Sequence, residues 1–347
     1  GALATIDSQM EESALISGAG KLTILRRITF PVVAPAFVAA LILTFGKTIG
    51  QFALPFLLGA PTQFHTVATM IYANLALGLD SMAYVLAVIL IAMSLLSIWL
   101  SNRFISKKSA RFETISGKGF RSREIDLGDW RWFVFGVVSL FGFTVGILPL
   151  ILLGIQSVML IDGFYGFENL TSHFWIGKSN LDIAGGEPGV IHNKIILGAT
   201  WNTLKLAFLS AVIAAVIGIV IAYIAVRRSN NPLAILLDQI AFVPFLFPTI
   251  AFGAMYLTLF AVPVGPIPAL YGTFTLLVLI SVVSRLPYSV KTGITAVTQI
   301  GQELEEAAEV AGASWWQRFR RIIMPLASSG IMSGMMVSFV GVMRELS

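Results

Sequence analysis

The chain has 347 residues, of which 56% are hydrophobic and only 12% are charged, with a net charge of +5 and a mean hydropathy of +0.86. A soluble domain usually carries about twice that charged fraction, so an ordinary soluble domain is excluded. The lack of cysteine excludes disulfides, thiolate metal sites and cysteine nucleophiles.

Apolar runs long enough to cross a bilayer, which takes about 20 residues, recur along the whole chain. They are predicted at 32–50, 81–101, 132–157, 201–226, 233–262 and 269–287, and a seventh begins near 326. The segment 52–79 is also apolar, but Pro55, Gly59 and Pro61 interrupt it, so it is expected to be re-entrant or interfacial. The pattern predicts an all-α, polytopic transmembrane helical bundle.

The two ends of the sequence indicate a fragment of a longer polypeptide. The chain begins at Gly1, and it stops at Ser347 within an apolar run.

Basic residues between the predicted spans set the orientation. One set of loops holds Lys21, Arg26, Arg27, Arg103, Lys107, Lys108, Arg111, Lys118, Arg121, Arg123, Arg131, Arg227, Arg228, Arg285, Lys291, Arg318, Arg320 and Arg321. The opposite set holds only Lys178 and Lys194. The first set is predicted to face the cytoplasm, and this distribution argues against a nucleic-acid partner.

Two charged segments match when the chain is shifted by 294 positions. Glu11, Glu12, Ala14, Gly18, Ala19, Arg26, Arg27, Ile28 and Pro31 fall on Glu305, Glu306, Ala308, Gly312, Ala313, Arg320, Arg321, Ile322 and Pro325. Six predicted spans separate the copies, so both lie on one side and the repeat is parallel. The predicted division is residues 1–101 for part of a first half, 102–131 for a basic cytoplasmic linker and 132–347 for the second half.

Each copy is predicted to fold as helix, sharp turn, helix at the cytoplasmic surface. Residues 305–311 favour a helix, and Gly312 can adopt the positive φ that ends it. Pro325 suits the first turn of the next membrane helix, where no amide donor is needed. Trp315, Trp316, Phe319 and Ile323 form an apolar stripe at helical spacing. A short exposed helix of this kind is a docking element for a partner's groove.

The pattern E-A-A, three residues, G, nine residues, I, one residue, L-P resembles the EAA loop of binding-protein-dependent ABC importer permeases. The second copy reads Glu306-Ala307-Ala308, Gly312, Ile322, Met324-Pro325, and the first reads Glu12-Ser13-Ala14, Gly18, Ile28, Phe30-Pro31. The stretches "GQFALPFLLGAPTQFHTVATMIY" and "MRELS" resemble fused ferric-iron permeases, which often carry Glu where this chain has Gln51.

This resemblance implies a type I ABC importer permease fold with two tandem parallel halves, the first incomplete. It implies ATP-driven import of a small solute across the bacterial inner membrane. Ferric iron is the expected solute, and thiamine, polyamines and phosphonates are the alternatives. A periplasmic binding protein would deliver the solute, and a cytoplasmic ATPase dimer would carry ATP and magnesium. The chain itself is expected to be no enzyme and to hold no cofactor or metal.

The residues expected to couple to the ATPase are Glu12, Ala14, Gly18, Pro31, Glu306, Ala307, Ala308, Gly312 and Pro325. For Glu12 and Glu306 the alternative to a coupling role is that the carboxylate lies near a helix N-terminus because the helix dipole favours it there.

The residues expected to line the translocation path are Lys47, Gln51, Arg344 and Glu345. A charge at the bilayer centre costs about 2.5–3.5 kcal/mol on insertion scales, so such groups should face a path or a partner. The alternative is that they snorkel to the outer interface. At the 294-residue offset, Gln51 matches Glu345. This predicts that the two residues are equivalent positions at the pore mouth.

Two other classes compete with an ABC permease. A secondary transporter driven by an ion gradient predicts paired intramembrane carboxylates and often inverted repeats. A non-transporting scaffold gives no reason for two matched cytoplasmic docking elements.

Overall fold

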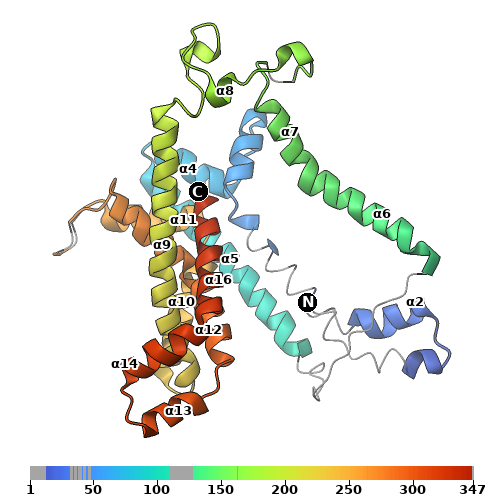
Figure 1. Cartoon of the computed structure of the whole chain (residues 1–347), viewed down its shortest axis with the longest axis vertical. Coiled ribbons are helices and arrows are strands. Elements are labelled where there is room, and N and C mark those ends of the chain that lie inside the picture. The colour runs from blue at the N-terminus through green and yellow to red at the C-terminus, as the bar shows by residue number, and fades with distance from the viewer. Residues whose placement is uncertain are drawn as a thin grey trace. The chain divides into compact units, whose positions relative to one another are not determined.

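The computed structural model describes residues 13–31, 34, 37, 41, 44, 45, 48–109, 128–161, 163–263, 265, 266 and 268–345. The chain forms two compact units, one of residues 1–120 with 204–347 and one of residues 121–203 (Figure 1). The division into two permease halves stays a prediction.

The unit of residues 121–203 consists of one long apolar helical run and an irregular loop. A 3-10 turn at Gly128–Trp130 leads into α6 (Arg131–Gly142), a π-helical turn (Phe143–Ile147) and α7 (Leu148–Gln156). The loop contains short turns at Phe167–Asn169 and Ala184–Gly186 and the single-turn helix α8 (His173–Ile176). Asn193 then caps α9, because its side-chain oxygen accepts from the amides of Ile195 and Ile196.

The larger unit contains the other helices of the described residues. They are α2 (Lys21–Ile24), α4 (Val67–Ala76), α5 (Asp80–Ser109), the main part of α9 (Lys194–Arg227), α10 (Pro232–Phe242), α11 (Thr249–Phe260), α12 (Phe274–Thr298), α13 (Glu303–Val310), α14 (Trp315–Arg318), α15 (Met324–Leu326) and α16 (Ser328–Met343).

Within the described residues, four helical segments are long and apolar enough to cross a membrane, and two bent pairs would bring the total to six. The four are Asp80–Ser97, Gly128–Gln156, Lys194–Arg227 and Phe274–Thr298. They confirm the spans predicted at 81–101, 132–157 and 201–226. Most of the predicted span at 32–50 lies outside the described residues.

The span predicted at 269–287 is displaced, and this corrects the placement of two basic residues. The helix runs from Phe274 to Thr298, so Arg285 and Lys291 lie inside α12 and not in a loop. Lys291 reaches Asp238 of α10 at 3.3 Å. The helix continues because residues 288–298 keep an apolar face that packs on its neighbours.

The apolar run predicted as a span at 233–262 is broken in the structure, where its two helices pass as a span only as a bent pair. The run divides into α10, a 3-10 turn at Val243–Leu246 and α11, because proline removes backbone donors and biases the preceding residue away from the helical region. Phe247, directly before Pro248, has φ −94° and ψ 135°.

The segment 52–79 is interrupted as predicted. A π-helical turn at Pro55–Gly59 and a 3-10 turn at Ala60–Thr62 precede α4, whose 10 residues reach about 15 Å, half of a hydrocarbon core. The following helix, α5, ends at Ser109, so residues 102–109 of the predicted linker are helical.

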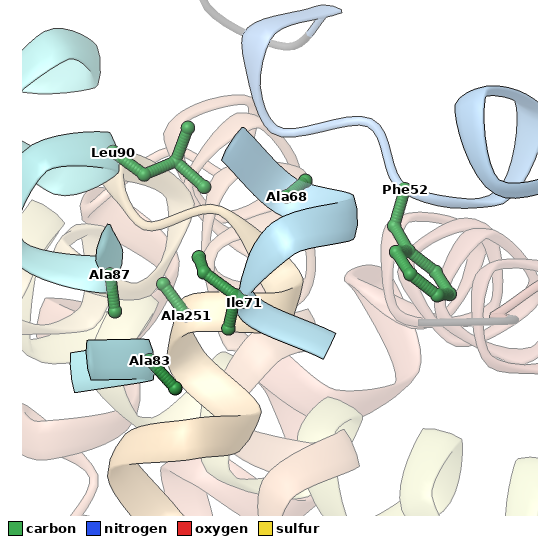
Figure 2. Packing of buried hydrophobic residues seen from close by; sticks show 7 residues of the cluster. All are labelled: Phe52, Ala68, Ile71, Ala83, Ala87, Leu90 and Ala251. Atoms are coloured by element: carbon green, nitrogen blue, oxygen red, sulfur yellow. The ribbon is translucent and has the colours of Figure 1, made fainter. Parts of the chain in front are cut away.

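A first apolar core joins α4, α5 and α11. Figure 2 shows Ile71 of α4 beside Ala251 of α11, with Ala83 and Ala87 of α5 on the same side of it. Ile71, Ala83 and Ala251 are fully buried. Because three of these four residues are alanines, the helices can approach closely, so residues far apart in sequence form one packed layer.

A second contact brings α9, α12 and α16 together through small residues. A Cβ added to Gly218 of α9 would lie 2.7 Å from the Cβ of Ser289 in α12, and one added to Gly293 would lie 2.8 Å from the Cβ of Ala222. A Cβ added to Gly330 of α16 would lie 2.4 Å from the Cβ of Ala296 in α12, beside which α16 lies in Figure 1. Small residues at four-residue spacing, here Gly218 with Ala222 and Ser289 with Gly293, let helix backbones approach, and van der Waals packing of this kind stabilises membrane helix pairs.

We predict that Gly218→Val destabilises the protein, because the added side chain must displace the backbone of α12. The expected loss in free energy of unfolding is about 1–3 kcal/mol, measured by thermal unfolding in detergent. Gly253→Val is the matched control, because a Cβ at Gly253 of α11 meets no atom within 4 Å. Equal melting temperatures for the two variants would contradict the close α9–α12 contact.

Candidate functional site

The C-terminal elbow, defined as residues 303–326, is a helix, a glycine turn and a second helical segment. Its first helix, α13, ends in a Schellman turn: Gly312 has φ +83°, its amide donates to the carbonyl of Glu309, and the amide of Ala313 donates to Ala308. The next helix, α14, begins with a capping box in which Ser314 and Gln317 exchange hydrogen bonds. The predicted helix, turn and helix are confirmed.

The N-terminal elbow, defined as residues 13–31, repeats this local structure position by position at the 294-residue offset. Gly18 has φ +80°, its amide donates to Leu15, and the amide of Ala19 donates to Ala14. Glu12, predicted to couple, lies outside the described residues. The turn glycines Gly18 and Gly312 are therefore required for their backbone conformation, because left-handed φ strains other residues.

Each elbow carries a π-helical turn that ends two positions before its proline. The turns are Leu25–Thr29 before Pro31 and Phe319–Ile323 before Pro325, which lies in α15. A proline in an ordinary α-helix clashes with the carbonyl four residues earlier and lacks the donor for it. The wider π turn shifts the hydrogen-bond pattern before the proline is reached. Pro325 thus lies in the elbow, and the chain bends by 70° after it, into α16.

The carboxylate that the fold buries is Glu305, which is 5% exposed. Its two oxygens accept from the Tyr223 hydroxyl at 2.7 Å and from Nε of Arg227 at 2.6 Å, both on α9. Arg227 also donates to the carbonyl of Ile300, at the end of α12, at 2.9 Å. The elbow is thereby fixed to the end of α9 by charge-assisted hydrogen bonds.

Aromatic packing continues this attachment. Phe319 and Ile323 are buried with Ile219 and Tyr223 of α9 and Val297 of α12. The ring of Phe319 lies 5.5 Å from that of Tyr223 and 5.3 Å from that of Trp315. Of the predicted apolar stripe, Phe319 and Ile323 are core residues, whereas Trp315 and Trp316 remain about half exposed.

The outer face of each elbow is open. Val310 is 91% exposed, and Ile16, which occupies the same position in the N-terminal elbow, is 88% exposed. Glu306 is also exposed, with one hydrogen bond from Gln302 at 2.9 Å. Ala307 and Pro325 are exposed, and Ala14, Ala308 and Pro31 are partly buried.

Three of the four residues predicted for a translocation path line one cavity of about 550 Å³. They are Gln51, Arg344 and Glu345; Lys47 lies outside the described residues. The other lining residues are Thr44, Thr48, Gly50, Phe52, Ala53, Thr249, Arg285 and Gly341. Arg285 is absent from the residues predicted for the path, because the basic pattern places it in a loop, although the apolar residues on both sides of it indicate a continuing helix.

We predict that Glu305→Ala destabilises the protein by about 3 kcal/mol, because Arg227 and the Tyr223 hydroxyl lose their buried acceptor. Chemical unfolding in detergent measures the change. Glu306→Ala, on the exposed face of the same helix, should change stability by less than about 0.5 kcal/mol. In an Arg227→Ala background, the effect of Glu305→Ala should shrink markedly; undiminished loss would contradict the pairing.

Comparison with known proteins gives one family. Residues 1–109 and 214–347 match the profile described as binding-protein-dependent transport system inner membrane component. The chain is 27% identical over its whole length to the putative ferric transport system permease protein FbpB 1 of Haemophilus influenzae, of which it covers 52%. It is 26% identical over its whole length to the ferric transport system permease protein FbpB of Actinobacillus pleuropneumoniae, of which it covers 48%.

A further match, over 45% of this chain and 58% of the relative, is 30% identical to the sulfate transport system permease protein CysT of Escherichia coli. The chain spans about half the length of the ferric relatives it matches. With its apolar helices, it is a multi-pass membrane protein of the type I ABC permease class. The chain belongs to the family of inner membrane components of binding-protein-dependent transport systems.

Proposed function

We propose that this chain is the membrane-spanning permease part of an ATP-driven importer in the bacterial cytoplasmic membrane. The two elbows bind a separate cytoplasmic ATPase dimer, which carries ATP and magnesium, and a periplasmic binding protein delivers the solute. The observation that supports this most is the identical local structure of residues 13–31 and 307–325, which gives a two-fold motor two equivalent docking elements.

The geometry also supports mechanical coupling. Glu305, Phe319 and Ile323 attach the C-terminal elbow to α9 and α12, so a force on the exposed helix α13 reaches membrane helices through buried contacts. Differential contacts of this kind can bias a two-state membrane element.

The solute is proposed from the relatives. The two ferric permeases match the whole chain, which favours ferric iron, and the sulfate permease matches part of it. Thiamine, polyamines and phosphonates remain the alternatives within the same function. A secondary transporter is disfavoured, because Glu345 is the one carboxylate among the described residues of the cavity wall.

We predict that Val310→Asp weakens binding to the ATPase by at least about tenfold, because a charge replaces an exposed apolar anchor at the docking face. Ile16→Asp should act alike, and the double replacement should abolish the complex. The measurement is co-purification of the full-length protein with its ATPase partner, together with solute-stimulated ATP hydrolysis in liposomes.

Leu181→Asp is the matched control, because Leu181 is 86% exposed but lies in the loop after α8. It should leave both measurements unchanged. Undiminished ATPase binding in the Ile16→Asp, Val310→Asp double variant would overturn the docking assignment.

A further inference from the structure

The wall of the 550 Å³ cavity is positively charged. Its charged side chains among the described residues are Arg285, Arg344 and Glu345, so two guanidinium groups accompany one carboxylate. The remaining polar wall residues are Gln51, Thr44, Thr48 and Thr249, which bring amide and hydroxyl groups. This set is rich in hydrogen-bond donors.

Among the three charged residues of the wall, Arg285 has the most unusual position for a charge. It lies near the middle of α12, a helix of 25 residues, and its side chain is 19% exposed. An ionisable residue inside a membrane span is costly to retain and marks a functional path by default. Arg285 forms an ion pair with Glu345 and donates to the carbonyl of Gly341 at 3.0 Å. Its buried Nε has no hydrogen-bond partner among the described residues, so the guanidinium group keeps donor capacity.

The carboxylate of Glu345 binds the guanidinium group of Arg285 as an anionic ligand would. Glu345 follows the end of α16, and its backbone amide donates to the carbonyl of Val342 at 3.1 Å in a turn. The side chain can therefore leave Arg285 by a rotation outside any helix. A planar guanidinium binds carboxylates and other oxyanions alike, so an entering anion can replace the carboxylate.

The described residues of the cavity wall do not offer the ligands that a bare metal cation needs. No group of three or more His, Asp or Glu side chains that could hold a metal ion occurs in the described part of the chain. The single wall carboxylate is already neutralised by Arg285, and Arg344 adds a further positive charge. Hard cations require several oxygen anions, which this wall does not offer.

We propose that the cavity takes small oxyanions, with Arg285 as the binding residue and Glu345 as its internal competitor. This inference rests on the proposed import function and narrows the substrate class. The oxyanion is either the free solute, such as sulfate, or the carboxylate shell of a ferric complex. Cationic solutes such as polyamines and thiamine are excluded from this site.

The test is ligand-induced thermal stabilisation of the full-length protein in lipid nanodiscs, at constant ionic strength. The probes are sodium sulfate, ferric citrate, sodium citrate and spermidine, each against sodium chloride. A ligand that binds only the folded state raises the melting temperature in proportion to its saturation. Sulfate also stabilises proteins in general, but that effect is equal in all variants and cancels in the comparison.

We expect sulfate or ferric citrate to stabilise the wild type, with opposite effects of the two charge replacements. Arg285→Gln should weaken the apparent affinity at least about tenfold, because a charged donor is lost. Glu345→Gln should strengthen it several-fold, because the competitor is lost. Arg285→Lys keeps the charge and should retain part of the binding, and Lys291→Gln, a basic residue of α12 outside the cavity wall, should change nothing.

The probes separate the two sources of the oxyanion. Stabilisation by sulfate indicates the free anion, and stabilisation by ferric citrate beyond citrate alone indicates the iron complex. Stabilisation by spermidine that Glu345→Gln abolishes, or no anion effect that depends on Arg285, would overturn the inference. Neither result depends on the ATPase, so ATP-driven uptake in liposomes tests the import function separately.

Discussion

The hydrogen bonds to the buried carboxylate of Glu305 are the interaction on which the position of the C-terminal elbow depends. This carboxylate joins the first helix of the C-terminal elbow to Tyr223 and Arg227 at the end of α9, and Arg227 joins both to the end of α12. A carboxylate buried this deeply is stable only while its partners are present. The elbow therefore moves with α9 and α12, which makes a displacement of α13 a displacement of the membrane helices.

Close packing of α9, α12 and α16 extends this rigid connection beyond the elbow. Glycine and alanine at the α9–α12 contact, and glycine at the α12–α16 contact, leave no room for the helices to slide without steric overlap. The last of these helices, α16, begins directly after the elbow at Ser328 and ends beside Arg344 and Glu345 in the cavity wall. Its 16 residues span about 24 Å. One helix thus connects the C-terminal elbow with the charged cavity, and a single rigid movement can alter both.

Much of this arrangement can be predicted from the sequence, and the failures have physical reasons. The elbows were predicted because the turn glycines and the repeated spacing are local signals, and local backbone geometry follows from them. Glu306 was favoured over Glu305 because a motif does not show which of two adjacent carboxylates faces the core; the partners that decide it, Tyr223 and Arg227, lie about 80 residues away. Arg285 was placed in a loop for a related reason. Its charge lowers the local hydropathy, whereas the partners that make the charge tolerable inside a helix, Glu345 and the Gly341 carbonyl, come from another element.

The relatives disagree on the solute while agreeing on the scaffold, and the structure gives a physical reason. The elbow contacts depend on backbone turns and apolar burial, which are independent of what is transported. The cavity depends on a few charged side chains, and one exchange changes its charge balance: a Glu in place of Gln51, as similar ferric permeases often carry, would add a second carboxylate and match the two guanidinium groups of the wall. With Gln at that position the wall retains its excess of guanidinium groups. Similarity of the whole chain to ferric permeases therefore supports the importer mechanism more strongly than it supports a bare ferric ion as the passing species.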